Sequence, residues 1–310
     1  MASSHFTILE NRAVLSVSGV DSVSFLQGLV SNDVEQVSET KAIWAAFLTP
    51  QGKFLHEFMV AGRPDRLLLD CEADRRDDLF TRLKRYRLRS KVEIEDEDNL
   101  VVAAAWGDTP TDAFTLSDEK GAAALLDDGF VFRDPRLIQA GLRLIGSSST
   151  IEKTCADPGF TPSDQATYDA HRIALGLPDG SRDLEIEKAL LLENGFEELG
   201  GVDFQKGCYV GQELTARTHY RALIKKRLLP VRIEGDAPPP GTALSVNGIN
   251  AGEMKSSSGA LGLALVRLAT WQSASDGQMT GGGATLRPEP TPWIKLPALA
   301  EKQTKTEFSN

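Results

Sequence analysis

One short segment concentrates the residue types that could do chemistry. Residues 204–217 read FQKGCYVGQELTAR, with Lys206, Gly207 and Cys208 in succession and a second glycine, Gly211, three positions further on. A nearby cation lowers the pKa of a thiol, and the thiolate is the form that acts as nucleophile or metal ligand. Glycine allows turns with positive φ and close approach of a ligand. The residues leave open a second interpretation, a tight strand-to-helix turn whose cysteine is buried as a small hydrophobe.

The composition predicts a protein of a reducing compartment. Three cysteines, Cys71, Cys155 and Cys208, are odd in number and far apart, and there is no CxxC. This argues against a disulfide framework and against a self-contained zinc or iron–sulfur site. The start of the chain has neither a secretory signal nor the arginines of a mitochondrial presequence, which a processed protein would also lack. We expect a cytoplasmic location.

Charge and hydropathy also limit the partners. The formal net charge is −10, which speaks against general affinity for nucleic acid. No apolar run approaches the roughly 20 residues that a helix needs to cross a bilayer. We therefore expect no nucleic-acid partner and no membrane.

The elements around the motif predict an α+β protein. Residues 6–17 read as two short strands joined by a hairpin turn at residues 10–12, and residues 42–60 as a second hairpin whose turn contains Pro50 and Gly52. Asp21 is a candidate N-cap for a short helix, and a longer helix is expected over about residues 72–87. Beyond residue 225, short apolar runs alternate with glycines, which is typical of a small antiparallel barrel or sandwich.

A basic block is followed at once by an acidic segment. The block holds six cations and the segment five carboxylates: Arg82, Lys84, Arg85, Arg87, Arg89 and Lys91, then Glu93, Glu95, Asp96, Glu97 and Asp98. A solvated helix end that runs into an acidic loop explains such a pattern. A basic rim for an anionic ligand, such as a carboxylate tail or a phosphate, is the alternative. The sequence leaves the role of this block open.

The motif is also specific enough to suggest a family. Residues 206–213, KGCYVGQE, resemble the KGCYxGQE signature of the YgfZ family, tetrahydrofolate-binding proteins related to the glycine-cleavage T-protein. The resemblance spans nearly the whole chain, through LQG at 26–28, NDV at 32–34, TPQGK at 49–53 and YRLRSKV at 86–92. LTARTH at 214–219 and the spacing of 13 residues from Glu193 to Lys206 are especially similar to the mitochondrial members that mature iron–sulfur proteins.

This resemblance implies a fold and a function. The fold is α+β, a T-protein-like cloverleaf of three domains around a central channel that holds folate. We expect a folate-binding body of two intertwined subdomains over residues 1–225, a small C-terminal β-barrel over 226–296 and a flexible tail over 297–310. The function is assembly or repair of [4Fe–4S] proteins with tetrahydrofolate or a derivative as cofactor. The partners are iron–sulfur scaffold or client proteins, and in a eukaryote the location is the mitochondrial matrix.

The resemblance also assigns roles to residues. Cys208 and Lys206 form the expected catalytic core, with Cys208 as nucleophile or as ligand to a transient iron–sulfur cluster; because no second cysteine is near, a partner must complete that site. Folate contacts are expected from Asn32, Asp33, Glu193, Gly207, Tyr209, Gln212, Glu213 and Arg217. Structural alternatives stay open: a turn for the first two, a solvated helix position for Glu193, and a surface ion pair between Glu213 and Arg217.

Two departures from the T-protein pattern bear on the reaction. T-proteins carry adjacent aspartates where this chain has His56 and Glu57, and a folate-contacting glutamate where it has Ala174. Both departures argue against the alternative function, a folate-dependent aminomethyltransferase, and favour a maturation factor. A third hypothesis is an interaction module with a vestigial pocket, for which a closed, apolar-filled channel would be evidence.

Overall fold

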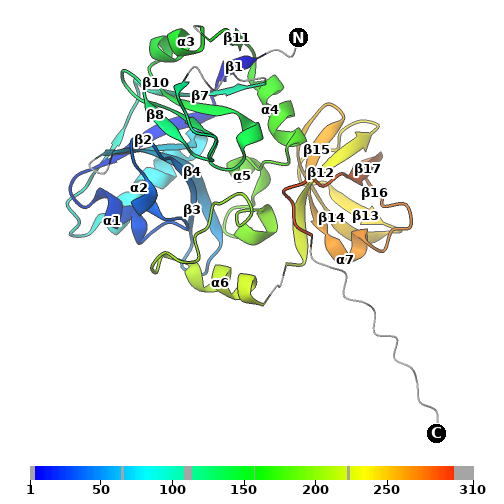
Figure 1. Ribbon diagram of the computed structural model, residues 1–310. Coiled ribbons are helices and arrows are strands. Elements are labelled where there is room, and N and C mark those ends of the chain that lie inside the picture. Colours follow the sequence, from blue (N-terminus) through cyan, green and yellow to red (C-terminus); the bar gives the residue numbers. More distant parts are fainter. Residues whose placement is uncertain (1–3, 64–65, 108–113, 157, 222–223, 297–310) are drawn as a thin grey trace.

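Two sheets and a closed barrel make up the described part of the chain (Figure 1). The computed structural model describes residues 4–63, 66–107, 114–156, 158–221 and 224–296. The predicted tail over 297–310 lies outside these residues. No helix among them is long and apolar enough to cross a membrane.

Two helices pack against the first sheet. Its five antiparallel strands are, in order, β3 (Ile43–Leu48), β4 (Phe54–Arg63), β5 (Arg66–Glu72), β2 (Arg12–Ser18) and β6 (Glu93–Asp96). β3 and β4 form the predicted hairpin, with Phe47 paired to His56. Helices α1 (Ser22–Gln27) and α2 (Arg76–Arg87) bury Phe25, Leu26, Leu79 and Leu83 in one core cluster with the sheet.

The second sheet begins with the N-terminal strand. Its order is β11 (Thr161–Pro162), β1 (His5–Ile8), β7 (Val101–Trp106), β10 (Leu142–Gly146), β9 (Phe130–Arg133) and β8 (Ala123–Leu125). Helix α3 (Ser148–Ala156) buries Ile151 and Cys155 against it. The predicted hairpin at residues 10–12 is wrong, because β1 pairs with β7 and β2 with β5. The sequence at residues 10–12 indicates a turn but does not specify which strands pair. The packing of the two sheets determines the pairing.

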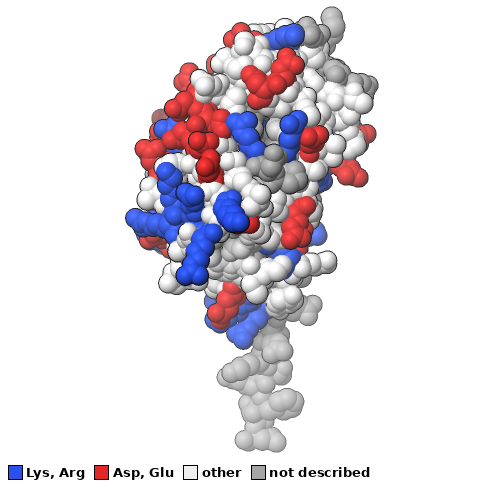
Figure 2. Space-filling model, turned by 90° about the vertical axis from the view of Figure 1, so that its left-hand side faces the viewer, with Lys and Arg blue, Asp and Glu red and all other residues white. Residues whose placement is uncertain are grey.

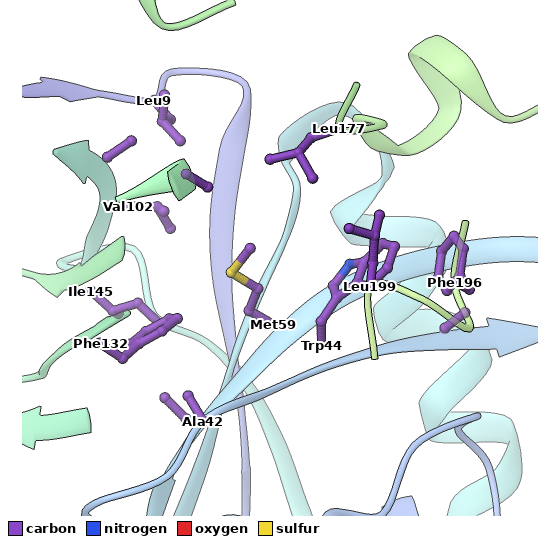
Figure 3. Packing of buried hydrophobic residues seen from close by; sticks show 14 of the residues in the cluster. Leu9, Ala42, Trp44, Met59, Val102, Phe132, Ile145, Leu177, Phe196 and Leu199 are labelled. Atoms are coloured by element: carbon purple, nitrogen blue, oxygen red, sulfur yellow. The ribbon is translucent and has the colours of Figure 1, made fainter. Parts of the chain in front are cut away.

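The main core lies where the two sheets meet (Figure 3). Trp44 and Met59 from the first sheet share one hydrophobic cluster with Phe132 and Ile145 from the second. The segment between the sheets and the barrel adds Leu177, Phe196 and Leu199 to this cluster, and Trp44 stacks on Phe196 with ring centroids 3.9 Å apart. The centre of the body is therefore packed with large side chains.

A helical segment connects this body to the barrel. It contains α4 (Gln165–Ala174), α5 (Gly180–Asp183) and α6 (Gln212–Tyr220). The barrel closes in the order β12 (Lys226–Glu234), β15 (Leu261–Arg267), β14 (Ile249–Ser258), β13 (Ala243–Val246), β16 (Met279–Gly281) and β17 (Ala284–Pro288), with α7 (Leu268–Trp271) beside it. Arg172 of α4 bonds both Asp183 and the hydroxyl of Ser256, so a buried cation holds α4, α5 and β14 together. Short 3-10 turns cover Val34–Gln36, Ala73–Arg75, Ile138–Ala140 and Leu191–Asn194.

Candidate functional site

The loop that carries Cys208 is held at both ends by hydrogen bonds. At its start, the Asp203 carboxylate accepts from the backbone N–H groups of Gln205 (2.6 Å) and Lys206 (3.0 Å). At its end, the N–H of Val210 donates to the carbonyl of Gly28 (3.2 Å), just after α1. The loop has no regular secondary structure, but the N–H groups of Gln205, Lys206 and Val210 fix its two ends.

Lys206 ties this loop to the end of α1. Its ammonium donates to the carbonyls of Gln27 (2.9 Å), Val30 (2.7 Å) and Asn32 (2.6 Å). A lysine has three N–H donors, so all three are used, and they satisfy carbonyls near a helix end that lack helical partners. Burial lowers the pKa of Lys206 to about 8, while Asp33 opposes the shift, so the group is an ammonium at neutral pH. These contacts make Lys206 a positioning residue; its catalytic role stays a prediction.

Cys208 differs from the other two cysteines in exposure. Its side chain is exposed, whereas Cys71 and Cys155 are buried. Burial raises the pKa of each of those two thiols to about 12, which keeps them protonated and inert. A Cβ added to Gly207 would meet no atom within 4 Å, so the space next to Cys208 is open. The alternative of a buried structural cysteine is therefore wrong for Cys208.

Gly211 closes the loop by packing against the turn at residues 49–53. It has φ +81° and precedes the first residue of α6. A Cβ on Gly211 would lie 2.4 Å from the carbonyl oxygen of Thr49, and one on Gly52 would lie 2.6 Å from the carbonyl oxygen of Gly211. Both positions need glycine because two backbone segments pass each other at contact distance. The turn at residues 49–53 and the loop at residues 204–211 thus form one structural unit.

Two predicted folate contacts are engaged within the protein. The amide of Asn32 donates to the carbonyls of Trp44 and Gly200, both at 2.8 Å. The carboxylate of Asp33 caps the turn at Val34–Gln36 and accepts from the amide of Gln27 at 2.7 Å. Their structural alternative is therefore present, and their contact with folate stays a prediction.

The remaining predicted contacts lie in three different environments. Tyr209 is buried in the main core, and burial raises the pKa of its hydroxyl to about 12. Glu213 and Arg217 form an ion pair of 2.6 Å on α6, with side chains 86% and 51% exposed, and Gln212 is half-buried at the start of that helix. Glu193 is half-buried near Lys226 and Lys53, and burial raises the pKa of its carboxyl group. The structure does not bring all these residues to one pocket.

A buried ion-pair network lies at the centre, and sequence reasoning missed most of it. Arg12 of β2 bonds Glu57 of β4 (2.6 Å) and Asp70 of β5 (2.5 Å), and lies 3.7 Å from Asp179. Arg143 of the second sheet lies 3.6 Å from Asp70, so the network joins the two sheets. The only signal in the sequence was a charge inside an apolar strand, as at Asp70 in RLLLDC.

The positions equivalent to the T-protein aspartates have structural partners. Glu57 accepts from Arg12 and from the indole N–H of Trp44. His56 is buried on the opposite face of β4, where it contacts Asp78 at 3.0 Å, and burial lowers its pKa to about 3. The imidazole is therefore neutral at physiological pH, and neither side chain is free for aminomethyl chemistry.

The centre of the body leaves little room for a cofactor. The cavity between Arg12, Glu57, Arg143, Tyr168 and Asp179 has a volume of about 10 Å³, roughly that needed by one water molecule. Pockets for ligands of folate's size are on the order of 300 Å³ or more. With these side-chain positions a pterin does not fit in this cavity, and its entry there would require residues of the network to move. Tetrahydrofolate binding by the chain stays a prediction.

The described residues hold no ready-made metal site. No group of three or more His, Cys, Asp and Glu side chains within them is arranged to bind a metal ion. His219, which could have partnered Cys208, instead stacks on Phe204 and contacts Glu197 at 3.1 Å. Any cluster at Cys208 therefore needs ligands from outside this part of the chain.

Comparison with known proteins supports the fold. Residues 225–296 match the family model described as the C-terminal β-barrel domain of CAF17. The crystal structure of the glycine-cleavage aminomethyltransferase T from Bartonella henselae superposes with a TM-score of 0.73 over 94% of this chain and 86% of that chain, at 13% identity. The predicted T-protein-like α+β fold with a C-terminal barrel is thus confirmed, and this similarity shows the fold alone.

Comparison of sequences identifies the family. The human mitochondrial iron–sulfur cluster assembly factor IBA57 is 36% identical over 83% of this chain and 76% of its own length. The mouse protein of the same name is 32% identical over 84% of this chain and 77% of its own length. The predicted relationship to mitochondrial-type members is confirmed at this level, and the finer YgfZ assignment stays a prediction. The chain belongs to the family of the IBA57 iron–sulfur cluster assembly factors.

Proposed function

We propose that this protein acts in the assembly or repair of iron–sulfur proteins, with Cys208 as one ligand to a cluster that a partner chain completes. One observation carries the proposal: an exposed thiol, with open space beside it at Gly207, stands on a loop fixed by hydrogen bonds. Since no group of three or more His, Cys, Asp and Glu side chains in the described residues is arranged to hold a metal, the cluster is a cargo shared between two chains. In a eukaryote the site of action is the mitochondrial matrix, a proposal supported by relatives that are named as mitochondrial. In a bacterium it is the cytoplasm.

The fixed loop suits this task. A ligand that is pre-positioned loses less conformational freedom on binding, so a single thiolate contributes more to a shared site. The three carbonyl contacts of Lys206 and the close approach of Gly211 to Thr49 provide this fixation. The protein then offers one cysteine in a defined place, and the partner supplies the other ligands.

Deletion and complementation test the proposal. Loss of the gene is expected to lower the activity of [4Fe–4S] enzymes, and a Cys208→Ala copy is expected to restore less than a tenth of it. Cys155→Ala is the matched control, because it also removes one sulfur but from a buried position. Full restoration by Cys208→Ala would exclude Cys208 as an essential residue.

Tetrahydrofolate binding is a separate proposal, supported by the family resemblance and by the T-protein-like fold. Isothermal titration of the full chain with tetrahydrofolate is the direct measurement. Trp44 donates a hydrogen bond to Glu57, which lines the central cavity, so a pterin that enters there would change the fluorescence of Trp44, and Trp44→Phe would abolish that change. No heat at high-micromolar protein would exclude tetrahydrofolate as a ligand and favour an interaction module with a closed centre.

A further inference from the structure

A strained turn exposes a leucine at the end of α2. The turn Arg87–Ser90 is closed by a hydrogen bond of 2.8 Å from the N–H of Ser90 to the carbonyl of Arg87. Leu88 has φ +44° and ψ −107°, and its side chain is 88% exposed. Such a backbone is suited to glycine and is strained for a bulky residue. A large apolar side chain is thus held outward at a position where folding alone would favour glycine.

A second exposed aliphatic residue lies on the adjoining loop. Val20 is 84% exposed. The carboxylate of its neighbour Asp21 accepts from the backbone N–H of Lys91 at 2.7 Å, so this loop is tied to the Leu88 turn. Asp21 was predicted to cap α1, but its side chain makes no capping hydrogen bond. Asp21, Leu88, Arg89 and Ser90 line a shallow hollow between the two loops.

Four cations surround these aliphatic residues without partners. In the described part of the chain, the side chains of Arg85, Arg87, Arg89 and Lys91 make no hydrogen bond or ion pair, and all four are exposed. Other arginines of α2 are paired; Arg82, for example, bonds Asp78 at 2.9 Å. Figure 2 shows Lys and Arg gathered on this face of a protein whose net charge is −10. Clustered like charges repel one another, so the arrangement favours an anionic partner.

This surface and the Cys208 loop are attached to opposite ends of the same helix. Lys206 binds the C-terminal end of α1 through Gln27, and Asp21, just before its first turn, binds Lys91. Helix α1 has six residues, so its length is about 9 Å. A standard protein interface buries roughly 800 Å² per partner and is therefore wide enough to cover both.

We propose that one surface of this protein docks an acidic protein, which presents an apolar socket for Leu88 ringed by carboxylates. This surface, here called the Leu88 surface, consists of Val20, Arg85, Arg87, Leu88, Arg89 and Lys91. The proposal rests on the proposed function, because the acidic protein is the one that shares the cluster at Cys208. A folded protein fits better than an anionic membrane: the acidic residues Glu93, Glu95, Asp96, Glu97 and Asp98 follow directly, and a continuous negative surface would meet them as well. Figure 2 shows acidic side chains beside the basic ones on this face.

Complementation separates this inference from the proposed function. Leu88→Gly should fold at least as stably as the parent, because glycine suits the turn, yet restore [4Fe–4S] enzyme activity several-fold less well. The double variant Arg87→Gln/Arg89→Gln should do the same. Asn247→Gly is the matched control for the turn, since Asn247 has φ +50° on the barrel, and Arg287→Gln is the control for charge, since Arg287 is exposed there. If Cys208→Ala fails but both surface variants restore full activity, the docking surface is overturned and the proposed function stands; if Cys208→Ala restores full activity, the proposed function falls.

Binding to defined probes checks the chemistry of the partner. The probe is a fluorescent amphipathic peptide with leucines on one face flanked by glutamates. The control peptide carries lysines in place of the glutamates. The acidic peptide should bind the full chain in a salt-dependent way, about tenfold more weakly to Arg87→Gln/Arg89→Gln and unchanged to Arg287→Gln. Equal binding of the lysine peptide would overturn the proposal. A third outcome is that the chain does not bind the acidic peptide but binds phosphatidylglycerol vesicles, and that the double variant loses this vesicle binding. That outcome would overturn the proposal and indicate a membrane as the partner.

Discussion

The Cys208 loop and the centre of the body differ in what their charged groups bind and in how much open space they leave. At the loop, a lysine is used to fix the backbone while the thiol and the space beside it stay open. At the centre, Arg12 and its carboxylate partners fill the region where a T-protein fold is expected to hold folate, and about 10 Å³ remains. The comparison shows that the exposed thiol lies on the loop, whereas the charged groups of the centre are paired with one another within the fold.

The largest expected effect comes from removing the central cation. Arg12→Ala leaves Glu57, Asp70 and Asp179 buried without their counter-charge, which should lower the free energy of unfolding by about 3–5 kcal/mol. Urea denaturation measures this change. Cys208→Ala is the control, with an expected change below about 0.5 kcal/mol. A small effect of Arg12→Ala would show that the centre is open to water, and it would contradict the contrast between a packed centre and an open loop.

Lys206→Met tests whether the loop is fixed by its lysine. The methionine keeps the apolar stem but leaves three carbonyls without their donor, so we expect a loss of about 2–4 kcal/mol in unfolding free energy. Hydrogen exchange of the loop amides should rise in parallel. If the variant is as stable as the parent yet inactive in complementation, the predicted catalytic role of Lys206 gains support over the positioning role.

The two glycines of the loop should respond differently to alanine. Gly211→Ala requires a positive φ and a Cβ 2.4 Å from the carbonyl oxygen of Thr49, which should cost about 2–3 kcal/mol. Gly207→Ala has open space and should change stability by less than about 0.5 kcal/mol. Thermal denaturation compares the two variants. A functional defect in Gly207→Ala with normal stability would sharpen the view that a partner approaches at this point.

The buried histidine beside the centre predicts a pH dependence. Its folded pKa of about 3 lies below the ordinary value of 6.5, so between these pH values the unfolded chain binds the extra proton. Stability from this group is therefore complete above pH 6.5 and falls by about 1.4 kcal/mol per pH unit as the pH is lowered toward 3. The difference between the parent and His56→Gln in urea midpoint, measured from pH 7 to 4, isolates it. A pH-independent difference would mean that the pKa of His56 is the same in the folded and the unfolded chain.

The smallest effect is expected on the exposed face of α6. Glu213→Gln removes a surface ion pair with Arg217, which should lower the unfolding free energy by about 0.3–0.5 kcal/mol and less at high salt. Thermal denaturation at low and high salt measures it. A loss of tetrahydrofolate affinity in this variant would instead support the predicted contact with the pterin.

Local patterns were enough to predict several parts of this molecule. The hairpin through residues 49–53, the amphipathic helix α2 and the C-terminal barrel follow from turn residues and from the spacing of apolar residues. The pairing of β1 did not follow, since a turn at residues 10–12 suits both a hairpin and a crossing between sheets. Leu88 was also beyond prediction, because nothing in its neighbours indicates a positive φ.

The sequence by itself determined the loop with its cysteine, its two glycines and its lysine, and with it the family. Only the tertiary structure decided what each of these residues contacts. Lys206 meets carbonyls 174 to 179 positions away, and Arg12 meets carboxylates from two other strands. Such contacts depend on how separate sheets and helices pack, and the spacing of residues along the chain does not show which distant segments will lie next to one another. For the same reason, the spacing of residues could not show that the side chains around Arg12 leave a cavity of only about 10 Å³.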